Sequence, residues 1–142
     1  MQALQYPHVV TLQVAFRDLD AMGHVNNAVY LSYLETARIE FMMDLLAFPN
    51  LMELPVILGE VTIRYLSPAL FGERLHIGSG ISRLGTKSFD LVHQIDTGDG
   101  RFIASAKTTL IMYDYARQTT QPIADTFRQQ VTNYQGDWIA PF

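Results

Sequence analysis

The chain has 142 residues, the length of one ordinary domain, and 49% of them are hydrophobic against 17% that are charged. This balance is typical of a folded globular protein with its own core, and it excludes a disordered chain. The formal net charge is −4 and no basic run occurs, which disfavours a nucleic-acid-binding role. Because there is no cysteine, zinc fingers, thiol nucleophiles and disulfide frameworks are excluded, and a cytoplasmic location is favoured.

No segment is expected to direct the chain to a membrane. The N-terminal run MQALQYPHVV lacks the basic start and apolar stretch of a signal peptide. Charged residues interrupt the longest apolar runs, so none is long enough to span a bilayer. We therefore expect a single domain over residues 1–142 in a soluble cytoplasmic protein with no membrane partner.

The first predicted elements are a strand and a long helix, with a polar loop between them. Alternating apolar residues predict a half-buried strand over residues 9–16. A helix is predicted over residues 28–46, and its largely apolar surface indicates that the core encloses it. A connection with a proline at each end, residues 49–55, follows the helix. The polar residues of the helix recur at every fourth position and form one narrow stripe: Ser32, Thr36, Glu40 and Asp44.

Four more strands and a short helix are predicted in the rest of the chain. The strands, each with alternating β-branched or aromatic residues, are residues 56–66, 74–84, 87–97 and 102–113. The turns between them (SPALFGE, LGT and TGDGR) are rich in Gly or Pro and suit antiparallel hairpins. We therefore expect these four strands to form a meander. The last predicted element is a short amphipathic helix over residues 123–134.

The predicted fold class is α+β, with a five-stranded antiparallel sheet wrapped around one long central helix. A helix that is apolar over most of its surface requires the sheet to curl around it. Such a sheet leaves two open edges, and native proteins usually pair or cover their edges. We therefore expect a homodimer in which the sheet continues from one subunit into the other.

Two familiar kinds of binding site are not favoured. The run GISRLGTKS has the glycine spacing of a phosphate-binding loop, but the residues after it alternate like a strand, and a phosphate cradle requires a helix there. The histidines His8, His24, His76 and His93 show no metal-ligand spacing, so no metal site is predicted. His76 and His93 fall within predicted strands, on the sheet surface or in a satisfied core.

The loop before the long helix, DLDAMGHVNN, is unusually polar. Asn26 or Asn27 is expected to cap the helix, because asparagine is among the best N-cap residues. One cap suffices, yet two aspartates, a histidine and two asparagines crowd around Gly23. The amides at a helix start favour an anion, and Asp20 precedes Asn27 by seven residues. If Asp20 folds back beside those amides, a nucleophile or general base meets an oxyanion hole; capping alone is the alternative explanation.

The run DLDAMGHVNNAVYLSYLETAR resembles the signature of the hotdog-fold acyl-CoA thioesterases, specifically the 4-hydroxybenzoyl-CoA thioesterase family and its long-chain acyl-CoA relatives. The resemblance covers nearly the whole chain, including the element order and the stretch IRYLSPALFGERLHIGSGISRLGTKSF. It implies the hotdog fold, hydrolysis of an acyl-CoA without a cofactor, and a homodimer or a tetramer of two dimers. It also implies active sites at the dimer interface, with the acyl chain beside the central helix.

The resemblance also assigns roles to residues. It implies that Asp20 acts as nucleophile or general base and that the Asn27 amide polarises the thioester carbonyl. We expect His24 and Asn26 to orient the loop or the attacking water. His24 and Asn27 match the long-chain branch, which favours an aliphatic acyl group.

Further substrate contacts are expected at Gly23, Tyr30, Arg64, Arg83, Lys87 and Ser88. In the family, basic residues near the third and fourth strands hold the CoA phosphates, and Lys87 with Ser88 matches the end of that patch. Some relatives carry two arginines before the matching lysine, where this chain has Gly and Thr, so Arg83 is the expected substitute. Tyr30 lines the acyl pocket or the core, and Arg64 is a surface residue unless the partner subunit covers it.

Two other functions remain open from the sequence. The first is hydrolysis of an acyl group carried on an acyl-carrier protein, for which an exposed basic face near Lys87 would be the sign. The second is a non-catalytic acyl-CoA-binding domain, which would bind without releasing thiol. A hydratase is less favoured, because that branch generally uses an Asp–His pair in a different loop. Glu35 and Arg38, which belong to the same signature, are expected to pair on the helix as structural residues.

Overall fold

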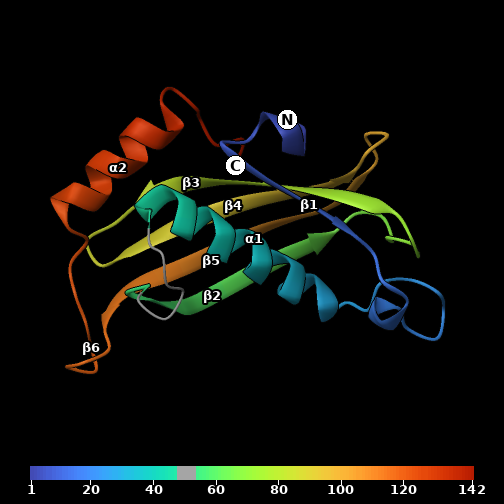
Figure 1. The fold of residues 1–142 in the computed structure, drawn as a ribbon, viewed down its shortest axis with the longest axis horizontal. Helices are drawn as coiled ribbons and strands as arrows, with labels where there is room; N and C mark the ends of the chain where they lie inside the picture. The colour runs from blue at the N-terminus through green and yellow to red at the C-terminus, as the bar shows by residue number, and fades with distance from the viewer. Residues whose placement is uncertain (48–53) are drawn as a thin grey trace.

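The computed structural model describes residues 1–47 and 54–142, and it shows a curled antiparallel sheet with one long helix against it (Figure 1). Most of the connection expected over residues 49–55 lies outside the described residues. The elements, in chain order, are the 3-10 turn η1 (Ala3–Gln5), β1 (His8–Gln13), the 3-10 turn η2 (Phe16–Asp18), α1 (Val29–Leu46), β2 (Val56–Tyr65), β3 (Arg74–Leu84), β4 (Ser88–Thr97), β5 (Phe102–Asp114), β6 (Thr119–Thr120) and α2 (Asp125–Gln135). The predicted α+β class is confirmed, and the short strand β6 was not foreseen.

The strands lie in the order β1-β3-β4-β5-β2, with every neighbouring pair antiparallel. The prediction of a four-stranded meander is therefore wrong for its first strand, because β2 pairs with β5 and not with β3. The segment SPALFGE is not a hairpin turn. It crosses from β2, at one edge of the sheet, to β3, which lies next to the opposite edge strand β1. Its turn residues suit a hairpin or a crossover. Contacts between segments distant in sequence determine which of the two connections forms.

Arg101 holds this crossover in place. Its guanidinium donates to Ser67 Oγ and to the Pro68 carbonyl, each at 2.7 Å, and it forms an ion pair with Glu73. The other Glu73 oxygen accepts from the Leu70 amide at 2.7 Å. Both ends of the crossover are therefore fixed from one side chain near the start of β5.

The long helix α1 packs one face onto the sheet. Its buried residues follow helical spacing: Tyr30, Tyr33, Leu34, Ala37, Phe41, Met42 and Leu45. The polar stripe predicted from the sequence is largely exposed on the other side. The prediction that the core encloses the helix is wrong for a single chain, because the sheet curls around one side only and leaves Leu31, for example, 45% exposed. The expected pair between Glu35 and Arg38 is present at 3.6 Å.

The shorter helix α2 closes one end of the sheet. Its Phe127 packs against Phe89 of β4, with ring centroids 5.0 Å apart, and Gln135 exchanges hydrogen bonds of 2.6 and 3.1 Å with the backbone of Ile81 on β3. The core beneath α2 is continuous with the second half of α1. None of the helices in the described ranges is long and apolar enough to cross a membrane.

A buried histidine lies on the central strand β4. His93 Nδ1 is 2.9 Å from Ser79 Oγ on β3, and its Nε2 is 3.3 Å from Thr108 Oγ1 on β5. All three side chains are fully buried. Burial, aided by the nearby positive charge of Arg38, lowers the pKa of His93 to about 3. The ring is therefore neutral near pH 7. Both of its nitrogens have hydrogen-bond partners, as expected of a histidine that is buried in the core.

This buried ring predicts a loss of stability in acid. The pKa of His93 is about 3 in the folded protein against 6.5 for an ordinary histidine, so between these values only the unfolded chain takes up the proton. The stabilisation is complete above pH 6.5 and declines as the pH falls toward 3. At about pH 5 the loss in the free energy of unfolding should be about 2 kcal/mol, measured by urea unfolding.

The matched control is His76→Gln, which removes a partly exposed histidine from the neighbouring strand β3. This variant should show the same decline between neutral and acid pH as the parent protein. His93→Gln should lose most of that decline, whatever its stability at neutral pH. An undiminished decline in His93→Gln would assign the acid sensitivity to other groups.

Candidate active site

The polar loop before α1 is folded back on itself by its own backbone. The Asp20 amide donates to the His24 carbonyl at 2.8 Å, and the Gly23 amide donates to the Asp20 carbonyl at 3.1 Å. Gly23 has a φ of +80°, a conformation that other residues adopt only with strain. Gly23 therefore makes the turn. It does not line the surface hollow beside Asp20, which is described below. The turn carries Asp20 back toward the start of the helix.

The two aspartates of the loop have different partners. Asp18 Oδ2 accepts from the Ala15 amide at 2.9 Å and from the Tyr33 hydroxyl of α1 at 2.7 Å. Burial, together with the hydrogen bond to this carboxylate, raises the pKa of Tyr33. The Asp18 carboxylate is thus used to hold the loop against the helix. The sequence spacing alone does not distinguish this structural aspartate from Asp20.

Asp20 presents its carboxylate to a surface hollow. Its Oδ1 accepts from the amides of Met22 at 2.9 Å and His24 at 3.3 Å, which fixes the side-chain orientation. The hollow has a volume of about 310 Å³. Its polar side chains are Asp20, His24, Asn27, Tyr30, Tyr65 and Ser67. Of the predicted site residues, the structure therefore brings Asp20, His24, Asn27 and Tyr30 together.

The start of α1 separates the roles of the two asparagines. Asn26 Oδ1 accepts from the Ala28 amide at 2.9 Å within the turn that leads into α1, and Asn26 does not line the hollow. The N-cap of α1 is Ala28 and no side chain caps it, so the expectation that Asn26 or Asn27 is the cap is wrong. Asn27 does line the hollow, and within the described residues no acceptor takes its amide hydrogen. This amide, in the turn that leads into the start of α1, is therefore available to a ligand, and the nearby end of the helix dipole favours negative charge there.

Two tyrosines complete the wall of the hollow. Tyr65, the last residue of β2, donates its hydroxyl to the Asn27 carbonyl at 2.8 Å. Its ring lies edge-on to Tyr30, with centroids 5.3 Å apart, and the Tyr30 hydroxyl accepts from the Ala69 amide at 3.2 Å. Burial raises the pKa of Tyr30, so its hydroxyl stays protonated near neutral pH. Sequence reasoning missed Tyr65, although strand alternation places it on the same face as the packed residue Ile63.

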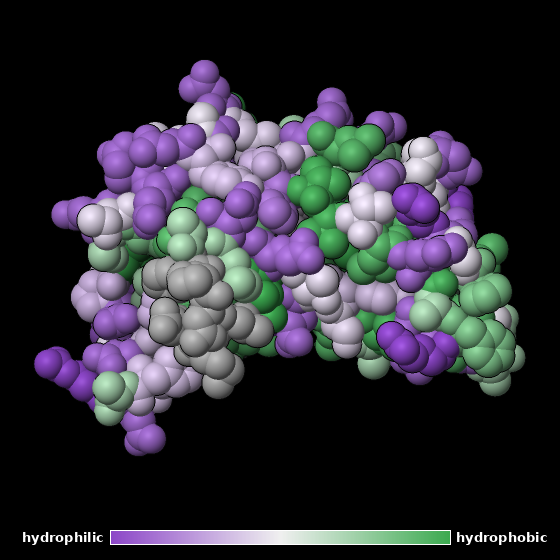
Figure 2. Space-filling view, in the orientation of Figure 1, coloured by the Kyte–Doolittle hydropathy of each residue, from purple (hydrophilic) through white to green (hydrophobic). Residues whose placement is uncertain are grey.

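Two exposed rings lie beside the loop. Phe16 and Phe71 are 77% and 62% exposed, and their ring centroids are 6.0 Å apart in an edge-to-face arrangement. Figure 2 shows apolar side chains at the surface of this end of the molecule. The polar hollow therefore lies near an apolar rim.

The residues predicted to hold phosphates lie elsewhere in the chain. Arg83 pairs with Asp90 through two hydrogen bonds of 2.7 and 3.1 Å and also donates to Ser88 Oγ at 3.0 Å. The Arg83 guanidinium lowers the pKa of Asp90. Lys87 is exposed in the turn after β3, and its Nζ is 3.4 Å from Thr120 Oγ1. These residues meet around the β3–β4 turn, and none of them lines the hollow that contains Asp20.

Arg64 also lies apart from that hollow, because it faces the other side of the sheet and lines a second, larger hollow with Lys107. Within the described ranges, no group of three His, Asp or Glu side chains is arranged to hold a metal ion. The hollow that contains Asp20 can therefore offer to a ligand a carboxylate, a histidine, the amide of Asn27 and the phenols of Tyr30 and Tyr65. This set suits attack on a polarised carbonyl.

Comparison with known proteins gives one consistent result. A family model described as the thioesterase-like superfamily matches residues 14–131. The long-chain acyl-CoA thioesterase FadM of Escherichia coli (strain K12) is 28% identical over 117 residues, which are 80% of this chain and 88% of that protein. The 1,4-dihydroxy-2-naphthoyl-CoA hydrolase of Thermosynechococcus vestitus is 31% identical over 116 residues, which are 79% of this chain and 80% of that protein.

Solved structures show the same likeness. A thioesterase from Thermus thermophilus, complexed with coenzyme A and Zn, superposes with a TM-score of 0.86 and is 29% identical. The match covers 98% of this chain and 100% of that one. The likeness therefore includes both terminal segments as well as the sheet and the two helices, and the hotdog fold expected from the sequence is confirmed.

The structural role of Asp18, whose carboxylate holds the loop against α1, can be tested by changing its hydrogen-bond partner Tyr33. Tyr33→Phe removes the hydroxyl that donates to Asp18 and changes little else, so the free energy of unfolding should fall by about 1 kcal/mol. Tyr113→Phe is the matched control, because the Tyr113 hydroxyl has no hydrogen-bond partner in the part of the chain that the structure describes. Equal stability of the two variants in urea unfolding would contradict a structural role for this hydrogen bond.

Proposed function

The chain belongs to the thioesterase-like superfamily, and from that premise we propose that it hydrolyses an acyl-CoA thioester to a carboxylic acid and free CoA. The observation that carries this proposal is the hollow shared by the Asp20 carboxylate and the helix-start amide of Asn27. One supplies a nucleophile or base, and the other supplies a donor for the developing oxyanion. The relatives named for long-chain acyl-CoA and 1,4-dihydroxy-2-naphthoyl-CoA hydrolysis support the substrate class.

In this proposal Asp20 acts through one of two routes. It attacks the thioester carbon directly, so that the C–S bond breaks, CoA leaves as the thiolate and water then hydrolyses the mixed anhydride. Alternatively, it takes a proton from a water molecule that attacks the same carbon. Both hydrogen bonds from the loop amides end on Oδ1, so Oδ2 is the oxygen left for either route.

The carbonyl oxygen of the substrate would bind the Asn27 amide at the helix start. An oxyanion there gains from the amide hydrogen bond and from the helix dipole, and both are in place before the reaction begins. Asn26 would act as a positioning residue, because its hydrogen bond from the Ala28 amide holds the turn that leads into α1. His24 faces the same hollow and would orient the attacking water.

Two hollows beside α1 offer apolar side chains to an acyl group, with Glu35 and Arg38 also at their borders, and neither shares a lining residue with the hollow that contains Asp20. A small hollow of about 130 Å³ between α1 and β2 is lined by Leu31 and Val61, and one of about 470 Å³ farther along is lined by Ile39 and Val56. The two hollows share Arg38 and Leu58. We propose that the acyl chain lies along these two hollows. The relatives include enzymes named for both long-chain and aromatic acyl groups, so a thiol-release screen over both classes is the test of acyl preference.

We also propose that the working form is a homodimer, with a tetramer of two dimers as a further possibility. The sheet has β1 and β2 at its edges, and the solvent-facing side of α1 carries exposed Leu31. A strand at a sheet edge and an exposed apolar helix residue are features that a second copy would cover. Size-exclusion chromatography with light scattering measures the assembly.

If Asp20 carries the chemistry, replacing it should reduce activity and leave the protein folded. Asp20→Asn keeps an oxygen that accepts the loop amide hydrogens but loses basicity and nucleophilicity, so kcat for acyl-CoA hydrolysis should fall by about 10² or more. The assay is release of free thiol from a panel of acyl-CoAs. The folded state should survive, as monitored by thermal unfolding.

Asp18→Asn is the control, because it alters the neighbouring carboxylate that faces the helix, and it should reduce kcat much less. A well-folded Asp20→Asn protein with near-normal kcat would refute the mechanism. Binding of acyl-CoA by the unmodified protein without any thiol release would show instead a non-catalytic binding domain. Activity restricted to an acyl-carrier-protein substrate would show that the acyl group is carried on a protein instead of on CoA.

The proposed chemistry uses only groups of the chain itself, so activity should be insensitive to a chelator. Thiol release should continue at an unchanged rate after incubation with EDTA and gel filtration. Loss of activity in EDTA that added Zn²⁺ or Mg²⁺ restores would show that a metal ion takes part.

A further inference from the structure

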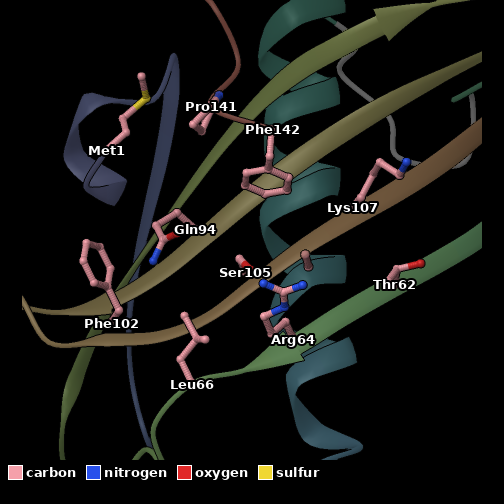
Figure 3. Close-up of a pocket in the computed structure, with 11 residues that line it drawn as sticks. Met1, Thr62, Arg64, Leu66, Gln94, Phe102, Ser105, Lys107, Pro141 and Phe142 are labelled. Atoms are coloured by element: carbon pink, nitrogen blue, oxygen red, sulfur yellow. The ribbon is translucent and has the colours of Figure 1, made fainter.

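Tyr65, the last residue of β2, reaches from the sheet to the hollow that contains Asp20. Its neighbours Arg64 and Leu66 line the larger hollow, of about 530 Å³, on the outer face of the sheet, and Figure 3 shows them on the near side of the strands with α1 behind. Successive side chains of a strand point to opposite faces, so Tyr65 points toward α1. It lines the hollow that contains Asp20 and is 44% exposed. Tyr65 is therefore the contribution of β2 to the candidate site.

The backbone that leads into α1 is wound more tightly than an α-helix. The Val29 amide donates to the Asn26 carbonyl at 2.9 Å, and the Leu31 amide donates to the Ala28 carbonyl at 3.1 Å. Both bonds span three residues, whereas those of an α-helix span four. An α-helix would offer the Asn27 carbonyl to the Leu31 amide. Here that carbonyl is passed over, because no backbone amide of the described residues donates to it.

The Tyr65 hydroxyl binds the carbonyl that the helix leaves free. It donates to the Asn27 carbonyl oxygen at 2.8 Å. The amide of the same residue has no acceptor within the described ranges, and Asn27 lines the hollow. Only two backbone rotations separate the amide of a residue from its carbonyl. A bond that fixes the Asn27 carbonyl therefore restricts the direction of the Asn27 amide.

Tyr65 is itself held by contacts outside the polar loop. Its ring lies edge-on to Tyr30, which is 2% exposed and accepts at its hydroxyl from the Ala69 amide at 3.2 Å. Just after Tyr65, the Leu66 amide donates to the Ile103 carbonyl of β5 at 2.8 Å. The sheet and a buried ring therefore set the position of the Tyr65 hydroxyl, and the loop is held to it.

The hydrogen of this phenol is already used. A tyrosine hydroxyl has one hydrogen to donate, and Tyr65 donates it to the Asn27 carbonyl. While that bond exists, Tyr65 cannot donate the same hydrogen to a substrate or to a leaving thiolate. Its effect on the chemistry must therefore pass through the backbone of Asn27.

We propose that Tyr65 is a positioning residue for the thioester carbonyl. Its hydrogen bond keeps Asn27 out of the regular helix and directs the Asn27 amide into the hollow, where that amide binds the developing oxyanion. This assignment rests on the proposed function. A donor aimed at the oxyanion stabilises the transition state more than the bound substrate, so losing its alignment lowers kcat and leaves KM unchanged.

The first test is kinetic. Tyr65→Phe keeps the ring beside Tyr30 and removes only the hydroxyl, so kcat for acyl-CoA hydrolysis should fall by about tenfold with KM unchanged. Tyr134→Phe is the matched control, because it removes a hydroxyl that donates to Asp44 at 2.6 Å near the other end of α1. Tyr134 lines neither the hollow that contains Asp20 nor the two beside α1. This control should lose comparable stability and keep its kcat.

Two further measurements do not depend on turnover. In NMR spectra of the ¹⁵N-labelled protein, Tyr65→Phe should shift the amide resonance of Asn27, and Tyr134→Phe should not. An S-alkyl-CoA thioether, which has no carbonyl, should bind the parent protein and Tyr65→Phe with equal affinity in calorimetric titrations.

The outcomes separate this inference from the proposed function. If the parent protein hydrolyses acyl-CoA and Tyr65→Phe keeps its kcat, the positioning role is overturned. A raised KM together with weaker thioether binding also overturns it, because Tyr65 would then contact the substrate directly. If the parent protein releases no thiol, the proposed hydrolysis fails, and the NMR comparison decides alone: a shifted Asn27 resonance supports the control of this amide by Tyr65, and an unshifted one overturns it.

Discussion

Hydrogen bonds to Asp18 fix the loop on which the candidate site is built. Its carboxylate accepts from the Ala15 amide on one side and from the Tyr33 hydroxyl of α1 on the other, and its carbonyl accepts from the Asn26 amide at 2.9 Å. One residue thus joins the end of the first strand, the end of the loop and the helix. Because these bonds set where the loop lies, the carboxylate two residues later is held at the start of the helix. The chemistry proposed for Asp20 depends on that placement.

The opposite wall of the hollow is positioned by a separate set of contacts. The crossover after β2 is clamped by Arg101, and the polar loop is joined to it through the Val25 amide, which donates to the Ala69 carbonyl at 3.0 Å. A bridge between His24 and Leu70 extends this pairing. The hollow therefore lies between two connections that are each fixed to the sheet or to α1. Such a site needs little reorganisation when a substrate binds.

Much of this fold was predictable because periodicity is a local property. The strand and helix patterns gave the elements within a few residues, and the polar run before α1 indicated the candidate site. The partner of β2 was not predictable, because SPALFGE suits a hairpin as well as a crossover, and the pairing of β2 with β5, which is distant in sequence, decides between them. Likewise, no spacing distinguishes Asp18 from Asp20, since the difference is the contact of Asp18 with Tyr33. Tyr65 was missed because its neighbours depend on that strand pairing.

The two faces of the sheet differ in chemical character. The face beneath α1 is apolar, and its buried histidine is kept neutral, whereas the outer face carries the cations Arg64 and Lys107. The hollows on the two faces come together at Leu66, one residue beyond the hydrogen-bonded strand Val56–Tyr65, because Leu66 lines both. A second copy that paired along β2 would therefore leave Leu66 outside the paired strands, so a sheet continued between two copies and a ligand that contacts Leu66 are compatible.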